Sequence, residues 1–503
     1  ERMGDVLHDG AFMARGAGEA PPANGGDAGL ALRVVSGPDA GTVWNLTPGT
    51  YSLGRGDEVD LSLRRDLQVS RHHAYVTVFE DAVSVRESAT AKNGVLVDGS
   101  RVGEATIGRG KLFQLGESVL SWTSDDTNGD RASVIADGKG ELTFNRPPRI
   151  PGATQAETVT FPGVHPERQK SPFPLVGVLA PVAIGVLMAL LLKRPEFLLF
   201  TLLSPIMAVS NFFSSNRRGK GSYKAQKTAY DSSLKSARDK ISRTVTRQEA
   251  AFREDFPDPG TVAEIARQPG SRLWERRAGN DDFLSLRFGL ARRRAEVMVA
   301  GKPPADVDLD PMLDLVPETM DLRAVGVLGI AGPRASCEGL ARWLVAQAAT
   351  FHAPADLSIT VLSGASQEEA WSWARWLPHV RPDGARCTAQ IGSTDATAAL
   401  LASELAELLE GRLHAEAARL LGRTEQAHLV VLDGAYRLGS IPAVARLLRN
   451  GPGVGISFIC IDDSEHLLPE ECQASAVFSA EEPTRLELRV SRAAPTTSVL
   501  ADL

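Results

Sequence analysis

The feature that most constrains this chain is an uncharged stretch in its first half. From Phe173 to Leu192 the sequence reads FPLVGVLAPVAIGVLMALLL, with no charged side chain over 20 positions. A helix of about 20 apolar residues is long enough to cross the roughly 30 Å hydrocarbon layer of a bilayer. A second apolar stretch runs from Phe197 to Phe213, near the lower limit of spanning length. The pair predicts a transmembrane hairpin over residues 171–214, with a buried helical hairpin in a soluble core as the alternative.

Basic residues flank this hairpin on both sides. They are Arg168 and Lys170 before it, and Arg217, Arg218, Lys220, Lys224 and Lys227 after it. Because basic flanks stay on the cytoplasmic side, both termini are expected in the cytoplasm, although Lys193 and Arg194 in the turn oppose this. Residues 215–320 are predicted to form a helical stalk and a connecting region. The basic charge of the stalk suits anionic lipid headgroups, so nucleic acid is not expected as a partner.

The segment from Leu30 to about Ser124 has a different pattern. Short alternating runs such as ALRVV, AYVTVF and GVLVDG are separated by turn residues such as SGPDAG and KNG. Many short strands at this spacing predict an all-β sandwich over residues 30–124. Residues 1–29 are interpreted as a partial preceding element with a linker, and residues 125–170 as a second linker.

Residues 321–503 alternate strand-like runs with amphipathic segments. AVGVLGI precedes CEGLARWLVAQAATF, and HLVVLDG follows a long helical pattern, which predicts an α/β domain with a mostly parallel sheet. The three tryptophans of WSWARW, at 371, 373 and 376, are interpreted as part of an amphipathic helix on that sheet. The four cysteines are scattered along the chain, so neither a zinc site nor a disulfide framework is indicated.

Within the β region, three motifs place phosphate-binding residue types at turns. Gly54-Arg55 is followed by Ser70-Arg71-His72-His73 and then by Lys92-Asn93-Gly94. Arginine offers a planar, charged fork, and serine and lysine add donors, which suits the charge and acceptors of phosphothreonine. His72 and His73 lack neighbours that would complete a metal site. The sequence predicts a phosphopeptide site with five residues: Arg55, Ser70, Arg71, Lys92 and Asn93.

The order of these motifs resembles the forkhead-associated (FHA) domain. The resemblance implies that Arg55, Ser70 and Lys92 contact the phosphate of a phosphothreonine protein. It also implies that Asn93 holds the ligand backbone and that His73 is structural. The alternative is a sandwich that binds no phosphopeptide and docks through another face.

A strand-to-helix segment near residue 330 resembles a degenerate ATP-binding loop. The GxxxxGK(S/T) pattern needs its second glycine to cradle phosphates and its lysine to reach the β and γ phosphates. Aligned from Gly329, this chain has Arg334, Ala335 and Ser336 at those positions, so the lysine is lost. In HLVVLDG, Asp433 follows an apolar strand and is of the type that positions a metal ion in ATPases. Gly434 stands in the next position, where ATPases often have a catalytic acid. The predicted degenerate nucleotide site comprises Gly329, Gly332, Arg334, Ser336 and Asp433. It is expected to have no catalytic residue and no metal.

Two further segments resemble type VII secretion ATPases of the FtsK/SpoIIIE family, the EccC and EssC proteins. They are LWERRAGNDDFLSLRFGLA, at residues 273–291, and WSWARWLPHVRPDG, at residues 371–384. The resemblance implies a multi-pass protein of the bacterial inner membrane that forms the regulatory and assembly portion of a translocase. It further implies other membrane subunits of the channel, cargo of the WXG100 kind and assembly as a homo-hexamer. No cofactor is expected in this segment, and ATP and Mg are expected in ATPase domains after Leu503.

Two other functions fit parts of the sequence. One is a DNA-translocating motor of the FtsK/SpoIIIE type, which would be an enzyme and would bind DNA. The other is an FHA signalling scaffold at the membrane, without translocation. This segment itself is expected not to be catalytic.

Overall fold

A computed structural model gives the structure of the chain. The residues that it describes are 30–79, 82–124, 134–136, 142–144, 146, 149, 157–163, 173, 175–192, 197–267, 270–304, 307, 310–381, 389–417, 426–490 and 496–503. The chain divides into two compact units. The first comprises residues 1–152, 251–292 and 314–503, and the second comprises residues 153–250 and 293–313.

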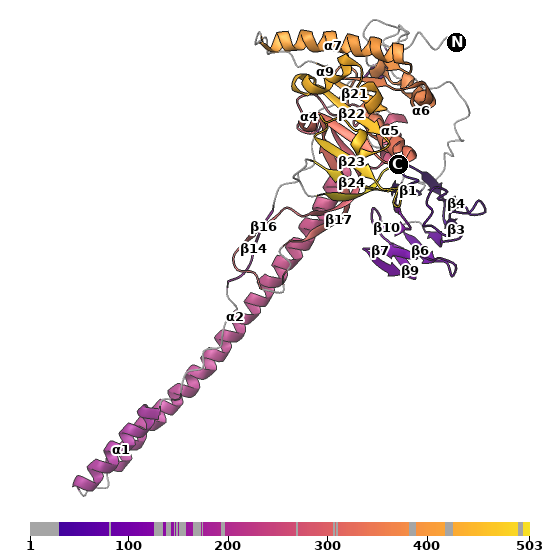
Figure 1. Ribbon diagram of the computed structural model, residues 1–503. Helices are drawn as coiled ribbons and strands as arrows, with labels where there is room; N and C mark the ends of the chain where they lie inside the picture. Colours follow the sequence, from indigo (N-terminus) through magenta and orange to yellow (C-terminus); the bar gives the residue numbers. More distant parts are fainter. Residues whose placement is uncertain are drawn as a thin grey trace. The chain divides into compact units, whose positions relative to one another are not determined.

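Residues 30–124 form the predicted β-sandwich. One sheet has the order β2-β1-β11-β10-β7-β8 and the other β4-β3-β5-β6-β9 (Figure 1). Alternate residues such as Leu53, Val76 and Phe113 are buried between the sheets. The strands are β1 Leu30–Ser36, β2 Val43–Leu46, β3 Gly49–Gly54, β4 Leu61–Ser62, β5 Ala74–Val78, β6 Val83–Glu87, β7 Val95–Val97, β8 Ser100–Val102, β9 Glu104–Ile107, β10 Leu112–Leu115 and β11 Ser118–Ser124. The all-β prediction for this region is confirmed.

A ten-stranded sheet forms the predicted α/β domain, in the order β17-β15-β25-β24-β23-β18-β22-β21-β19-β20. The strands from β23 to β20 pair in parallel, whereas β23, β24, β25 and β15 pair antiparallel to one another in that sequence. The strands are β15 Ser285–Arg294, β17 Met312–Asp321, β18 Val327–Ala331, β19 Leu357–Leu362, β20 Ile391–Gly392, β21 Ala427–Asp433, β22 Ile456–Asp462, β23 Ala474–Phe478, β24 Arg485–Arg489 and β25 Thr497–Ala501. The mostly parallel core follows the prediction.

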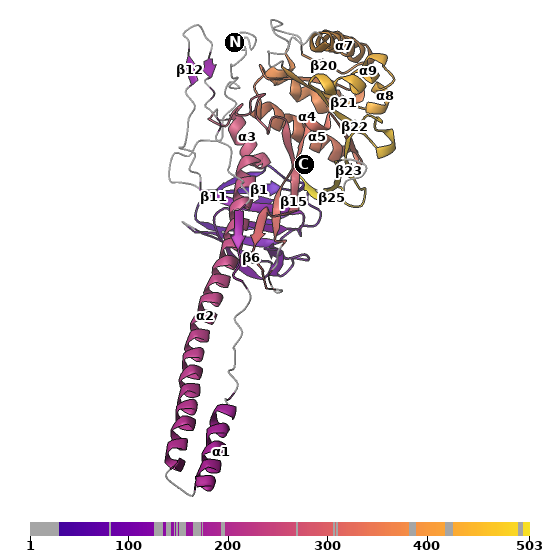
Figure 2. The same cartoon turned by 90° about the vertical axis from the view of Figure 1, so that its left-hand side faces the viewer.

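Helices cover both faces of this sheet (Figure 2). On β22, Ile459 and Ile461 face a core built with α5, whereas Phe458 and Cys460 face a core built with α7 and α9. Strands buried on both faces read as continuous apolar runs, which explains the ISFICI sequence. The helices are α3 Pro259–Arg267, α4 Leu322–Val325, α5 Arg334–Phe351, α6 Glu368–Trp371, α7 Asp395–Ala417, α8 Ala435–Leu438 and α9 Pro442–Asn450; the 3-10 turns are η1 Ala365–Gln367, η2 Ser372–Trp376, η3 Pro378–Val380, η4 Pro452–Val454 and η5 Glu465–Leu467.

The connecting region before residue 321 contributes strands, which the predicted boundary missed. Strands β15 and β17 extend the sheet on the side away from β18. The segment just before them is anchored by Arg276, which is fully buried and stacks between the rings of Phe256 and Phe351. Its guanidinium donates to the Ser285 carbonyl at 2.5 Å. Residues 273–276 and Phe283 of the LWERRAGNDDF segment are buried, so these positions have a structural role in the domain.

The predicted amphipathic helix around the three tryptophans is wrong. The single turn of α6 gives way to the 3-10 turns η2 and η3. Trp371 is buried and stacks on Trp373, with ring centroids 6.4 Å apart. The Trp371 indole donates to Asp433 at the end of β21, and the helical run ends at Trp376 because Leu377, which precedes Pro378, is extended.

The second unit contains the apolar hairpin sequence and the stalk. Helix α1 spans Leu175–Leu192, and α2 spans Phe197–Asp255 and continues into the first unit. The second apolar stretch does not end near residue 213 as predicted, because it and the stalk are one helix of 59 residues. Within the part of the chain that the structure describes, no helix combines the length and apolarity needed to cross a bilayer. The two predicted spans are not confirmed.

A small sheet inside the second unit was predicted as linker. Strand β14, Glu157–Thr160, pairs in parallel with β16, Val297–Ala300. Buried Val159 and Phe161 pack against Ala237 of α2, together with the partly buried Leu234 and Ile241. These three residues of α2 lie three or four positions apart and share the helix face that packs on this sheet. In the first unit, β12 Val134–Ala136 and β13 Leu142–Phe144 form another antiparallel pair inside the predicted linker.

Candidate phosphopeptide site and nucleotide-like site

The three motif loops of the sandwich are held together by backbone hydrogen bonds. The Arg55 amide, just after β3, donates to the Ser70 carbonyl at 2.9 Å, and the Gly56 amide donates to the Arg71 carbonyl at 3.1 Å. The Lys92 amide, in the loop between β6 and β7, donates to the Ser70 hydroxyl oxygen at 3.2 Å. Segments that lie up to 37 residues apart in sequence, from Arg55 to Lys92, therefore meet at one group of loops.

His73 locks these loops from below. It is fully buried, and its Nδ1 accepts a hydrogen bond from the Ser70 amide at 2.9 Å. That bond assigns the ring proton to Nε2, which lies 2.9 Å from the Gly94 carbonyl oxygen and donates to it. The structural role expected for His73 agrees with these contacts.

Glycines allow the close approach of the loops. A Cβ atom on Gly54 would lie 2.0 Å from the Arg71 carbonyl oxygen, so only glycine fits there. Gly94 adopts a φ of +72°, and a Cβ there would also collide with the side chain of Arg101. The GR and NG motifs thus have a steric cause that is independent of any ligand.

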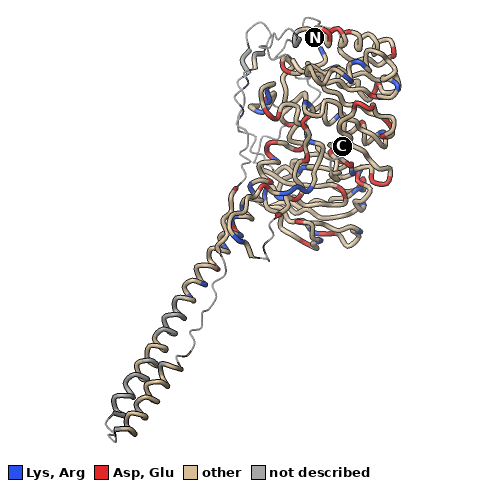
Figure 3. The backbone as a smooth tube through the Cα atoms, turned by 60° about the vertical axis from the view of Figure 1, so that its left-hand side comes forward, with Lys and Arg blue, Asp and Glu red and all other residues tan. Residues whose placement is uncertain are grey.

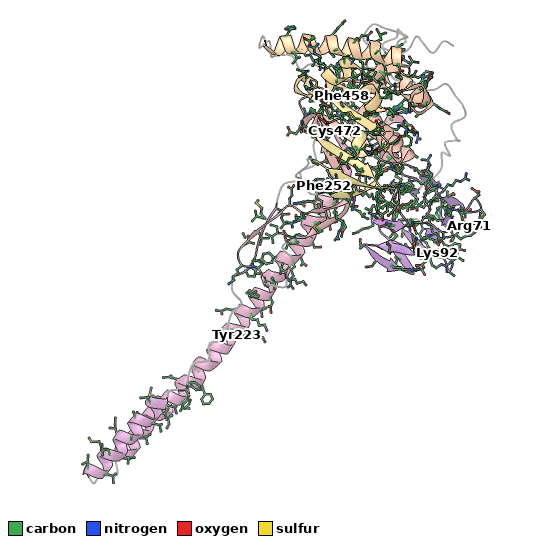
Figure 4. All side chains as sticks on the ribbon, viewed as in Figure 1. Arg71, Lys92, Tyr223, Phe252, Phe458 and Cys472 are labelled. Carbon is green, nitrogen blue, oxygen red and sulfur yellow. The ribbon has the colours of Figure 1, made fainter. Side chains whose placement is uncertain are left out.

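The basic side chains at these loops are available to a ligand. Arg55 is half-buried, and its Nε donates to the Val69 carbonyl at 3.2 Å, which orients the guanidinium. Arg71 and Lys92 are exposed, and Figure 4 places both on the violet sandwich. Among the described residues, no carboxylate lies within 4.0 Å of the charged nitrogens of Arg55, Arg71 or Lys92. Three cations without an acidic partner in the described part of the chain favour an anionic ligand.

Nearby acidic side chains have other partners. Glu58 lies 3.3 Å from the His72 ring, and Asp57 lies 3.2 Å from Arg64. Asn93 donates through its side-chain amide to the Gln68 carbonyl at 2.8 Å, which fixes the third loop. The Ser70 hydroxyl accepts from Lys92 and keeps its own proton for donation. Each of the five sequence-predicted residues thus lies on these three loops.

The nucleotide-like loop of the α/β domain is much shorter than the alignment implies. Gly329 lies inside β18, paired with Cys460 of β22, and not in the loop. Helix α5 begins at Arg334, so only Gly332 and Pro333 connect the strand to the helix. A phosphate cradle needs several backbone N–H groups, and proline has none. Gly332 has a φ of +132°, and a Cβ there would lie 2.6 Å from the Phe478 carbonyl oxygen.

Arg334 is engaged by the protein itself. Its two terminal nitrogens each lie 2.5 Å from an oxygen of Asp433, and its Nε lies 2.6 Å from Glu338. Burial alone opposes the positive charge, but the two carboxylates outweigh it and raise the pKa of Arg334 above its ordinary value. Asp433, which is fully buried at the end of β21, also accepts from the Trp371 indole at 2.7 Å. The bidentate fork therefore neutralises the carboxylate that would position a metal.

The remaining site residue points elsewhere. Ser336 is buried, and its hydroxyl donates to the Pro483 carbonyl at 2.6 Å. Glu338 and Trp371 complete the cluster, and sequence reasoning missed both; only the i, i+4 spacing of Arg334 and Glu338 on one helix signals their contact. Among the described residues, no group of three metal-binding side chains gathers.

Known proteins resemble this chain in two ways: a protein family matches the β-sandwich, and EccC proteins match a longer part of the chain. The family described as the inner membrane component of type III secretion systems, cytoplasmic domain, matches residues 33–125. An EccC protein of an ESX secretion system from Thermomonospora curvata is 27% identical over 274 residues, covering 51% of this chain and 19% of the relative. An EccC protein of the ESX-3 system of Mycobacterium tuberculosis strain H37Rv is 28% identical over 338 residues, covering 61% of this chain and 24% of the relative.

Among solved structures, the FHA domain of a Chlamydia trachomatis protein matches with a TM-score of 0.18 and 24% identity, covering 19% of this chain and 97% of that one. The matched part of this chain spans a quarter or less of the length of the two EccC proteins. Over about half of its length, the chain is therefore distantly similar to the EccC proteins of ESX secretion systems, and its sandwich has an FHA-like fold.

Proposed function

We propose that this chain is the regulatory and assembly part of an ESX (type VII) secretion translocase, and that its sandwich binds phosphothreonine peptides. The observation that carries this proposal is the set of three cations, Arg55, Arg71 and Lys92, on loops that His73 and backbone bonds hold rigid. A fixed rim of donors loses little entropy when it captures a phosphate, and charge-assisted bonds are the stronger ones. The secretion role rests on the likeness to EccC proteins.

Arg55 is the residue with the strongest expected contribution. We expect the full chain to bind a degenerate phosphothreonine peptide library and Arg55→Ala to weaken binding about 30- to 100-fold. That range corresponds to the roughly 2 to 3 kcal/mol of one charge-assisted pair. Isothermal titration calorimetry measures the change, with the unphosphorylated library as the ligand control. Arg86→Ala, an exposed arginine on β6, is the matched protein control and should bind normally. Unchanged affinity in Arg55→Ala would remove the phosphopeptide function.

The α/β domain is proposed to act as a structural coupler without ATP hydrolysis. Support comes from the two-residue loop before α5 and from Arg334, which holds Asp433 in a bidentate pair. A magnesium ion positioned by Asp433 would first have to displace that guanidinium. In the complete translocase, the motor activity and its ATP and magnesium would belong to other domains, as would cargo of the WXG100 kind and assembly as a hexamer.

Attachment to the bacterial inner membrane through the apolar hairpin, with both termini in the cytoplasm, is the further part of this proposal. Helix α1 carries no blue or red position in Figure 3 and exposes large apolar side chains such as Leu175, Val176 and Leu190. Exposed apolar surface of this extent favours lipid or another apolar partner. The proposal requires the chain to stay with the membrane fraction after alkaline extraction; recovery in the supernatant would exclude it.

A further inference from the structure

Two cysteines that do not form a short paired motif in the sequence lie together on one face of the α/β sheet. Cys460 is fully buried on β22, and its side chain belongs to the core formed with α7 and α9. Cys472 lies just before β23 and packs against the same core. In Figure 4 the labelled Cys472 lies over the α/β sheet, in the same region as Phe458 of β22.

Gly329 of β18 shows how close the two sulfur atoms come. It is the direct register partner of Cys460, so the two residues face the same side of neighbouring strands about 4.8 Å apart. A Cβ built on Gly329 would lie 3.2 Å from the Cys472 Sγ and 2.5 Å from Leu468. The missing side chain of Gly329 therefore leaves space for the Leu468 side chain and for the Cys472 sulfur beside it, next to the Cys460 side chain. This role in packing accounts for a glycine that the sequence pattern assigned to a phosphate loop.

Through Gly329, the geometry places the two cysteine side chains next to each other in the same core. A hydrogen bond with the Cys472 thiol, followed by burial, raises the pKa of Cys460 well above its ordinary value. Cys472 is partly exposed and lines a cavity of about 590 Å³ together with Leu468, Gln473 and Arg489. An oxidant can reach the sulfur of Cys472 through this cavity, whereas Cys460 is fully buried.

We propose that Cys472 and Cys460 form an oxidisable pair that closes to a disulfide when it meets a hydroperoxide. The Cys472 sulfur, as its thiolate, attacks one oxygen of hydrogen peroxide; an S–O bond forms, the O–O bond breaks, and the leaving hydroxide takes up the thiol's proton to give one water. The Cys460 thiol then attacks the sulfenic sulfur, forming the S–S bond and releasing the second water. Two thiols and one peroxide thus give one disulfide and two waters. The bond would tie β22 to the segment that leads into β23.

Oxidation of the intact chain followed by mass spectrometry tests this pair. The full-length protein is treated with hydrogen peroxide, denatured, alkylated and digested. Of the four cysteines, two should become inaccessible to alkylation, and a peptide linking Cys460 to Cys472 should appear. In Cys460→Ser, Cys472 should instead accumulate as sulfenic acid that dimedone traps. Cys337→Ala should leave the link unchanged.

Two results would overturn the proposal. One is a peroxide-treated chain in which Cys460 stays alkylatable while Cys472 reaches sulfinic acid, because the resolving step would then be absent. The other is a link from either cysteine to Cys387 in place of the Cys460–Cys472 link. Since every form is read after denaturation, a variant with reduced stability still gives a result.

Discussion

At two places in this protein, a glycine and then an arginine stand where a strand ends: Arg55 after β3 and Arg334 after β18. The two places differ in what surrounds the arginine. In the sandwich, Arg55 is oriented by a carbonyl and has no carboxylate within 4.0 Å among the described residues. In the α/β domain, Arg334 is held by the carboxylates of Asp433 and Glu338. An unpaired cation near rigid donors can accept a phosphate, whereas a paired one has already satisfied its charge. Whether a loop can bind an anion therefore depends more on the side chains that surround its arginine than on the sequence motif that contains the arginine.

The largest effect is expected from removing the carboxylate of Asp433, which pairs with Arg334. Asp433→Ala leaves the partly buried charge of Arg334 and the Trp371 indole without their common acceptor. Breaking a buried pair from one side costs about 3 kcal/mol, so we expect a loss of that order in the free energy of unfolding of the α/β domain. Urea unfolding of the full chain followed by tryptophan fluorescence measures it.

An exposed ion pair provides the control for that variant. Asp395 pairs with Arg437 but is 86% exposed, so Asp395→Ala should change the free energy of unfolding by less than about 0.5 kcal/mol. Adding Arg334→Ala to Asp433→Ala should recover part of the loss, because no uncompensated charge remains. Equal stability of Asp433→Ala and the parent chain would show that the pair does not hold the site closed.

The stability of the α/β domain should depend on pH because it buries histidines in their neutral form. Burial lowers the pKa of His379 to about 4, and burial followed by the charge of Arg412 lowers the pKa of His428 to about 4. The ordinary value is about 6.5, so the unfolded chain binds more protons between these limits. Stability is therefore complete above about pH 6.5 and falls as the pH drops toward 4. The slope is about 1.4 kcal/mol per pH unit for each histidine.

Thermal unfolding of the full chain at several pH values checks this dependence. His428→Gln should flatten the fall in stability by the share of one histidine, whereas His414→Gln, at an exposed position on α7, should not change it. A midpoint temperature that stays constant between pH 6.5 and 4 would contradict the buried, neutral state of these histidines.

The sequence predicted the sandwich well because its signals are local. The motif residues at the turns, such as Gly54-Arg55 and Asn93-Gly94, can be recognised from short stretches of sequence, and their order led directly to the five residues of the candidate phosphopeptide site. The α/β core was also predictable, because strands buried on both faces read as apolar runs. Helix α2 was divided in the prediction, because the change from apolar to basic composition near residue 214 does not end a helix.

Long-range pairings could not be read in the same way. The contact of Trp371 with Asp433 joins residues 62 positions apart, and neither residue type signals the other. Gly329 matched a phosphate-loop glycine by spacing, although its cause is the close approach of Leu468 and Cys472 on a distant segment. Strand β14 was assigned to a linker because it is four residues long and is stabilised by tertiary partners such as β16 and α2. Such elements depend on tertiary partners that a local pattern does not contain.

The most direct measurement is equilibrium binding of two ligands to the same sample of the full chain. One is a degenerate phosphothreonine peptide library, and the other is ATP with magnesium. The account predicts saturable binding of the peptides that free phosphothreonine competes away, together with no ATP binding up to millimolar concentration. ATP binding without peptide binding would contradict the assignment of phosphate recognition to the sandwich and not to the loop before α5.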